Sequence, residues 1–288
     1  MGKLFALLAA MGYGANTTLS RLTYDTGTDP VSLTIYRYAM IAALFAVIVV
    51  VTRKSMRVGM KWRYYLGCVF GMFAISLGHL GAVNYIPVSL AAIVFYTYPL
   101  QVIAYRRWIN NQPTSWPEGA GFILAFIGLV IALGPDFHHL DWRGIVLAVF
   151  GSFGAFVFMI SYEAFPDDAD PYVCSALIAF GTFGLCCGIL LTGIELTPPS
   201  QSVGWMYLWA NAGLTVLALI FTVLAISRIG AKGTSLFLNI EPILILILAW
   251  IVLSESLTVA RWAGALLVVA SLLLGQMRGQ KRTPQNKA

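Results

Sequence analysis

Residues 86–121 read IPVSLAAIVFYTYPLQVIAYRRWINNQPTSWPEGAG, and residues 229–264 read IGAKGTSLFLNIEPILILILAWIVLSESLTVARWAG. The two stretches align without a gap, about 143 residues apart. Each is a long apolar segment broken by one proline, then a polar turn and a second apolar segment. A looser match sets Asp29-Pro30 against Asp170-Pro171, with the register slipped by two. A duplication of this length predicts two related structural repeats.

The composition places these repeats in a membrane. Hydrophobic residues make up 59% of the chain, charged residues 10%, and the mean hydropathy is +0.81. A soluble domain carries about 25% charged residues, so this chain has too few charges to cover a surface in water. No Asp, Glu, Lys or Arg occurs in residues 64–105, 144–162, 171–194 or 196–227. The sequence therefore predicts an all-α integral membrane protein.

A bilayer-spanning helix needs about 20 apolar residues, which divides the chain into ten predicted spans. These are 4–23, 30–52, 62–85, 88–109, 116–134, 144–163, 171–193, 204–227, 232–253 and 259–277. The apolar run after Lys3 is expected to be a retained first span rather than a signal peptide. The first repeat is expected over 1–140, the second over 141–277, and a basic tail over 278–288.

Lysine and arginine set the expected orientation. With ten spans, most basic residues fall on one side: the 2–3 loop, the end of the fourth span, the 8–9 turn and the tail. Only Arg21, Arg143 and Arg261 fall on the other side. We expect a multi-pass protein of the plasma membrane with both termini in the cytoplasm. Because each half has five spans, the second half enters from the opposite side and the halves form inverted repeats, as in many secondary transporters.

Several motifs resemble one known family. Asn239-Ile240-Glu241-Pro242, followed by Leu253-Ser254-Glu255-Ser256-Leu257, resembles the second-half signature of the drug/metabolite transporter superfamily, EamA type. Tyr98-Pro99-Leu100 matches the corresponding proline of the first half, and Arg37 matches an arginine common in the second helix. Gly12-Tyr13-Gly14-Ala15-Asn16 is similar to the first-helix pattern, with Tyr13 where tryptophan is usual. The first copy departs at Asn111-Gln112, where the family often has Gly-Glu, and this weakens any role for that turn.

The resemblance implies ten helices with cytoplasmic termini. Helices 1–4 and 6–9 would surround a central cavity, and helices 5 and 10 would pack outside it and could form a homodimer. It implies a secondary active transporter, and more narrowly an exporter, of amino acids, metabolites or amphipathic drugs. Transport would proceed by alternating access, with proton coupling in many members.

Glu241 is the first candidate for a functional residue. Counted from the start of the ninth span, it lies roughly 14 Å deep, near the bilayer midplane. A charge there costs at least about 2.5–3.5 kcal/mol, so the carboxyl must be protonated, paired or facing a water-filled cavity. It could carry the coupled proton, or it could be a neutral carboxyl bonded to a neighbouring helix. Pro99 and Pro242 are candidate hinges, with a static kink as the alternative.

Other polar residues could line the same cavity. Arg37, roughly 10 Å below the outer surface, could bind a substrate carboxylate, pair with Glu241 or snorkel to the interface. His79 could relay protons or simply pack, and Asn16 and Asn239 could bind substrate or join helices. The remaining candidates for the lining, of which aromatic residues could stack on a ligand, are Tyr36, Tyr96, Tyr98, Trp209 and Asn211.

The repeat alignment shows that the charges are not duplicated. In the 143-residue register, Glu241 corresponds to Tyr98, and His79 corresponds to Thr222. With the slip of two, Arg37 corresponds to Ile178. A duplicated scaffold with single charges suits an asymmetric substrate that has a distinct charged end.

The sequence predicts no cofactor, no metal and no nucleic-acid partner. His138, His139 and Asp141 have ligand chemistry, but they lie in a short loop without a fourth ligand. The four cysteines have neither zinc nor disulfide spacing. The expected partners are a small-molecule solute, membrane lipid and protons. A membrane-embedded lipid-modifying enzyme and a non-transporting scaffold remain as alternatives.

Overall fold

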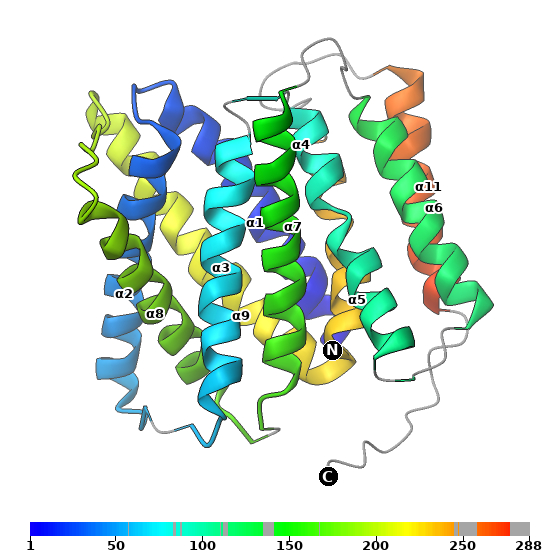
Figure 1. The fold of residues 1–288 in the computed structure, drawn as a ribbon, viewed down its shortest axis with the longest axis horizontal. Coiled ribbons are helices and arrows are strands. Elements are labelled where there is room, and N and C mark those ends of the chain that lie inside the picture. Colours follow the sequence, from blue (N-terminus) through cyan, green and yellow to red (C-terminus); the bar gives the residue numbers. More distant parts are fainter. Residues whose placement is uncertain are drawn as a thin grey trace.

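The computed structural model describes residues 1–56, 58–82, 85–86, 88–109, 111, 115–134, 141–166, 168–244, 247 and 258–276. Every regular element in these residues is a helix, and the helices stand roughly side by side (Figure 1). They are α1 (Gly2–Tyr24), α2 (Pro30–Thr52), α3 (Trp62–Ala82), α4 (Val88–Phe95), α5 (Tyr98–Trp108), α6 (Trp116–Leu133), α7 (Trp142–Glu163), α8 (Pro171–Leu190), α9 (Ser202–Leu238) and α11 (Val259–Gln276).

Within the described residues, four helices of at least 18 residues are apolar enough to cross a membrane: α2, α7, α8 and α9. The segments Gly119–Leu133 and Val259–Ser271 are shorter apolar helices. The expected all-helical membrane protein is therefore what the chain forms. Most of residues 245–257, which belong to the predicted ninth span, lie outside the described residues, so the ten-span count stays a prediction.

The observed helices differ in form from the predicted spans at two places. The predicted fourth span, 88–109, is not continuous, because it divides into α4 and α5 at Tyr96 and Thr97. The predicted turn between the eighth and ninth spans is present, as a sharp bend at Gly230 within α9. Gly230 alone makes this bend, with φ 74° and ψ 169°. Glycine has no Cβ to oppose a positive φ, so the chain turns within one residue.

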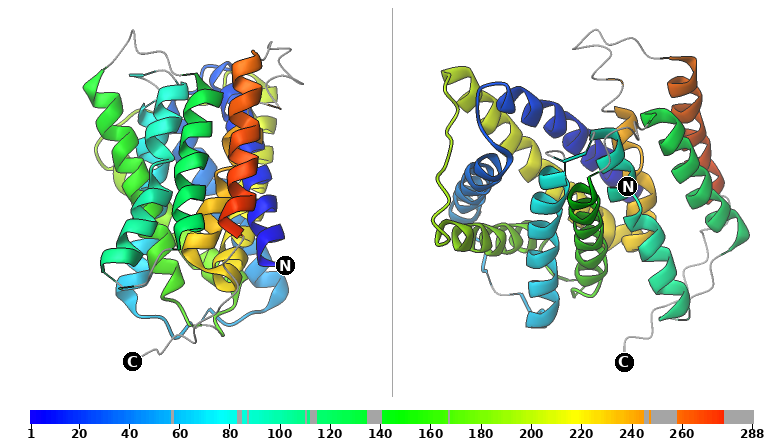
Figure 2. Two further views of the ribbon diagram at one scale, coloured as in Figure 1. Left: turned by 90° about the vertical axis from the view of Figure 1, so that its right-hand side faces the viewer. Right: turned by 45° about the horizontal axis from the view of Figure 1, so that its top comes forward.

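Three helix pairs make the most extensive contacts: α1 with α9, α3 with α7, and α6 with α11. Small residues let the backbones approach closely, as is common between helices in membranes. A Cβ on Gly71 would lie 2.7 Å from the carbonyl oxygen of Gly154, and one on Gly128 would lie 2.8 Å from that of Gly264. The pair α6–α11 stands at the right-hand edge of the bundle in Figure 1 and in the right-hand view of Figure 2.

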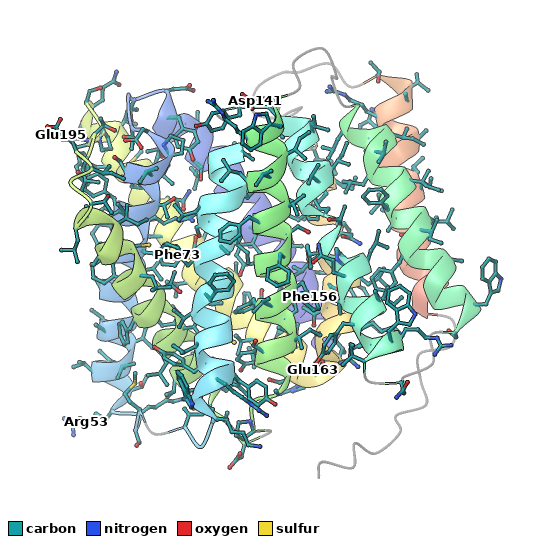
Figure 3. All side chains as sticks on the ribbon, in the orientation of Figure 1. Arg53, Phe73, Asp141, Phe156, Glu163 and Glu195 are labelled. Atoms are coloured by element: carbon teal, nitrogen blue, oxygen red, sulfur yellow. The ribbon has the colours of Figure 1, made fainter. Side chains whose placement is uncertain are left out.

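The N-terminus and the end of α11 lie at the same end of the bundle, which we call the terminus face (Figures 1 and 2). Arg53 and Glu163 also lie toward the terminus face, whereas Asp141 and Glu195 lie at the opposite face (Figure 3). The chain runs toward the terminus face through α4 and α5. In the second repeat, the part of α9 after the bend at Gly230 runs away from the terminus face (Figure 1). The two proline-containing spans therefore run in opposite directions.

Candidate functional site

The two proline-containing spans are both broken, and at corresponding places. Tyr96 and Thr97 separate α4 from α5, and Asn239 and Ile240 separate α9 from the helical residues 241–244. Each break precedes a proline, which has no N–H to donate to the carbonyl four residues earlier. Tighter bonds take over, such as Thr97 N–H to Val94 O at 3.2 Å and Asn239 N–H to Leu236 O at 3.3 Å. The sequence predicted a kink at each proline, and the structure has a local interruption of the helix.

An aromatic cluster surrounds the first break. The ring of Phe95 lies 5.3 Å from that of Tyr96 and 5.6 Å from that of Tyr98, between centroids. His79 on α3 lies against the same Phe95 ring at 4.8 Å. Its Nδ1 is buried and has no hydrogen-bond partner among the described residues. His79, Tyr96 and Tyr98, all predicted to line the cavity, therefore share one cluster.

Glu241 begins the helical residues after the second break and faces this cluster. Its carboxyl lies beside Tyr96 and within electrostatic range of Tyr98 and of Tyr13 on α1. Glu241 itself is half-buried, while Tyr96 and Tyr98 are buried. A single acidic group thus interacts with three phenols, whose rings can stack on a ligand and whose hydroxyls can hydrogen-bond to it.

Arg37 is buried in the same region from the side of α2, with 8% of its surface exposed. Its Nη2 donates to Ser76 Oγ at 3.2 Å, and its guanidinium carbon lies 5.4 Å from the centre of the Tyr38 ring. Among the described residues no carboxylate lies within ion-pair distance of Arg37, and its Nε has no hydrogen-bond partner. In this structure Arg37 is therefore not paired directly with Glu241, and its buried guanidinium bonds to Ser76 on α3.

Tyr13 connects the two charged groups, because it lies within electrostatic range of both Arg37 and Glu241. Its hydroxyl also accepts a 3.4 Å hydrogen bond from Thr222 Oγ1. Tyr13, Ser76 and Phe95 are not among the site residues predicted from the sequence. Tyr13 could have been found as the aromatic residue inside the Gly12–Asn16 motif, but Ser76 and Phe95 have no distinguishing pattern.

Asn16 and Asn211 join helices instead. Asn16 Nδ2 donates to Thr215 Oγ1 at 2.7 Å, and Asn211 Nδ2 donates to Ser20 Oγ at 2.8 Å. Each hydroxyl in turn donates to the backbone oxygen of the asparagine four residues earlier in its own helix. The result is a reciprocal ring of hydrogen bonds, buried between α1 and α9. Of the two readings left open for Asn16, the structure favours the helix-joining one.

The remaining candidates divide between the outer helices and the two breaks. Tyr36 makes an edge contact with Trp205 at 5.3 Å between ring centroids, and Trp209 is 49% exposed. Asn239 is buried at the second break, and its Oδ1 has no partner among the described residues. Pro99 and Pro242 are buried directly after the two breaks. No group of three metal-ligating side chains occurs in the described part of the chain. His138 and His139 lie outside it, and Asp141 caps α7 by accepting the Arg143 N–H.

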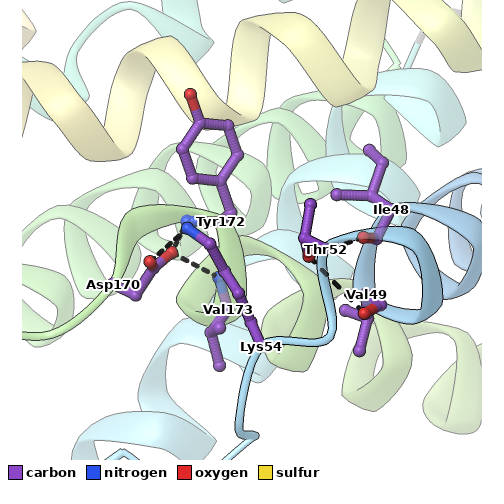
Figure 4. Close-up of polar contacts among 7 residues, drawn as sticks. All are labelled: Ile48, Val49, Thr52, Lys54, Asp170, Tyr172 and Val173. Carbon is purple, nitrogen blue, oxygen red and sulfur yellow. Dashed lines mark hydrogen bonds and ion pairs between the residues drawn. The ribbon is translucent and has the colours of Figure 1, made fainter.

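Two aspartates outside the spans cap helices, and each also bonds to a residue in a distant loop, Thr197 for Asp29 and Lys54 for Asp170. Asp170 accepts the N–H groups of Tyr172 and Val173, and it forms an ion pair with Lys54 (Figure 4). Partial burial alone would raise the pKa of Asp170, but these donors outweigh it and lower the pKa below its ordinary value. The pKa of Asp29 is lowered in the same way: hydrogen bonds from Ser32 and Thr197 overcome its partial burial.

The fold and the site together define a class of protein: a helical membrane protein with isolated buried charges around an aromatic centre. Such charges mark substrate or ion pathways by default. Residues 1–134 and residues 142–275 each match the EamA-like transporter family, so the chain belongs to that family. It is a transporter, and not an enzyme.

Named relatives agree with this assignment. An uncharacterized transporter of Archaeoglobus fulgidus is 24% identical over 269 residues, which are 85% of this chain and 88% of the relative. The aromatic amino acid exporter YddG of Escherichia coli is 26% identical over 226 residues, 70% of each chain. A crystal structure of another protein, 15% identical, matches 97% of this chain and 99% of its own with a TM-score of 0.80. At that identity, the match shows a common fold.

Proposed function

We propose that this protein exports small organic solutes that carry a carboxylate, with amino acids bearing an aromatic side chain as the leading class. The observation that carries this proposal is Arg37: a buried guanidinium without a carboxylate partner among the described residues. A buried charge needs a counter-charge, and a planar guanidinium matches a carboxylate with two parallel hydrogen bonds. The substrate would supply the missing anion.

The aromatic cluster would hold the rest of the substrate. Tyr13, Tyr96 and Tyr98 all interact electrostatically with the Glu241 carboxyl, and Tyr13 also interacts with Arg37. Rings of this kind favour flat apolar groups and cations. A zwitterion would set its carboxylate on Arg37 and its ammonium toward Glu241. The exporter YddG, a relative named for aromatic amino acids, supports the same substrate class.

We infer that Glu241 couples transport to protons. An acid isolated in an apolar bundle binds its proton or its cationic ligand, but not both at once. Competition between the two would couple export of the solute to the inward movement of protons down their gradient. The protein would work in the plasma membrane by alternating access of two inverted repeats, with its terminus face in the cytoplasm. The concentration of basic residues on that side supports this orientation.

A ligand series tests the proposal, because it separates the two ends of the substrate. Purified protein is assayed by thermal stabilisation with phenylalanine, its methyl ester, phenethylamine and 3-phenylpropionate. A ligand that binds the native state raises its apparent stability. We expect phenylalanine and phenylpropionate to stabilise the protein. The ester and the amine should need at least tenfold higher concentrations for the same rise in melting temperature.

A variant assigns the preference to Arg37. Arg37→Gln should abolish the difference between acid and ester, whereas Arg37→Lys should keep part of it. Arg53→Gln, an exposed arginine at the end of the same helix, is the matched control and should behave like the wild type. If Arg37→Gln still distinguishes phenylalanine from its ester, Arg37 does not bind the carboxylate.

A further inference from the structure

Three helix ends from both halves of the chain meet at the terminus face, in a cluster that we call the inner lock. It consists of Arg106 at the end of α5, Glu163 at the end of α7, and Ala231 just after the bend in α9. Glu163 Oε2 forms an ion pair with Arg106 Nη2, and Glu163 Oε1 accepts the Ala231 N–H at 3.0 Å. Only 10% and 17% of the two charged side chains are exposed. The pair is therefore largely shielded from water, unlike Lys54 and Asp170, which are 34% and 37% exposed.

The bend at Gly230 explains why Glu163 fits there. A helix that restarts after a bend presents N–H groups without intrahelical partners, and a carboxylate is a favourable cap for them. A Cβ on Gly230 would lie 2.7 Å from Glu163 Oε1, so a larger residue would displace the carboxylate. The glycine thus provides both the positive φ and the space for the lock.

The inner lock lies directly below the candidate site along two helices. Arg106 follows Tyr98 by eight residues in α5, and Ala231 precedes Asn239 by eight residues in α9. At about 1.5 Å per residue, both paths from the breaks to the lock measure about 12 Å. The lock therefore joins the ends of the two broken spans, between the site and the terminus face.

The repeat does not supply a second lock at the opposite face. In the 143-residue register, Glu163 corresponds to Ser20, and to Leu22 with the slip of two; Arg106 corresponds to Ala249. None of these residues carries a charge. We propose that Arg106 and Glu163 are positioning residues that close the terminus face, and that they must separate before the site opens to that side. The ion pair would stabilise only the closed conformation, and so would shift the population toward it.

The test measures access to the site from the terminus face. Asn239→Cys places a thiol at the second break, and a membrane-impermeant methanethiosulfonate is added from the side of the membrane that holds an epitope-tagged terminus. The background rate is the labelling rate of the protein without Asn239→Cys, which still has its four native cysteines. We expect Arg106→Gln and Glu163→Gln each to raise the labelling rate of this thiol at least tenfold, and Arg106→Lys to raise it much less.

Controls separate a gate from general loosening. Lys54→Gln breaks an ion pair at the same face but away from the two broken spans, and should leave the labelling rate unchanged. Size-exclusion chromatography identifies folded variants; if Glu163→Gln does not fold, the two Arg106 variants decide. Labelling that stays slow in folded Arg106→Gln, or that rises equally in Lys54→Gln, overturns the proposal. Since no substrate is added, this result does not depend on what the protein transports.

Discussion

The helix breaks before Pro99 and Pro242 occupy corresponding positions of the repeat, yet they are held differently. At the first break, Thr97 Oγ1 donates to Val94 O at 2.7 Å and lies 2.9 Å from Ser152 Oγ on α7. Gln101 Nε2 donates to the same Ser152 Oγ at 2.7 Å. Three polar side chains thus brace the first break against α7.

Among the described residues, no counterpart of the Ser152 brace holds the second break. The repeat places Ile240, Leu244 and Ala9 at the positions of Thr97, Gln101 and Ser152. Ile240 and Leu244 pack against the apolar core, and Asn239 Oδ1 lacks a partner among the described residues. Apolar contacts are non-directional, whereas hydrogen bonds fix a geometry. From this difference we expect the first break to be the more rigid one and the second break, which carries Glu241, to be the hinge.

The largest effect should come from the charge at the second break. Glu241→Gln keeps the size of the side chain but removes the titrating proton, so proton-driven transport in liposomes should fall to the level of empty vesicles. The fold should persist, because an amide is less costly than a carboxylate in an apolar bundle. Tyr98→Phe, at the corresponding position of the first break, is the control and should retain most of the transport. Equal loss in both variants would contradict the asymmetry.

The next effect concerns stability at the first break. Ser152→Ala leaves Thr97 and Gln101 without their shared partner and should destabilise the protein by about 1–3 kcal/mol. Thermal unfolding in detergent should show a melting temperature lower by several degrees. Asn239→Leu, at the second break, removes an unpartnered oxygen and should change stability by less than about 1 kcal/mol. A larger loss of stability in Asn239→Leu would reverse the comparison.

Replacing the prolines should distinguish the breaks by transport rate. Alanine at 242 restores an N–H that can bond to Leu238 O, so the second break can close into continuous helix. We expect Pro242→Ala to slow transport about fivefold, equivalent to about 1 kcal/mol. Pro99→Ala should change the rate less than twofold, because the Ser152 brace keeps that break in place. The initial rate of solute counterflow measures both.

The smallest effect is expected at the two capping aspartates, which are held alike. Asp29→Ala and Asp170→Ala should each cost about 1 kcal/mol, the usual value of an N-cap. Both native pKa values are lowered, so the stabilisation is present above the unfolded value of about 3.9 and is lost as the pH falls through the native pKa. Melting temperatures between pH 7 and pH 3 measure this loss. High salt should weaken only the Asp170 cap, because only Asp170 is paired with a charge.

The sequence allowed the helical membrane fold and part of the site to be predicted. Charge-free apolar segments and proline positions are local signals, so the spans and both kinks could be found. The contacts of Arg37 could not, because Ser76 comes from another helix and serine has no membrane-specific pattern. The turn at Gly230 could be predicted from the flanking basic residues, but its contact with Glu163 could not, because Glu163 is distant in the sequence.

The pairing of helices has a consequence for how the two copies can exist. α1 pairs with α9, α3 with α7, and α6 with α11, so each close pair takes one member from residues 1–134 and one from residues 142–276. A polypeptide severed between the copies would leave each fragment with unmatched glycine and asparagine surfaces toward lipid. Each repeat therefore needs the other to bury these surfaces, and neither is expected to be stable in lipid as a single copy.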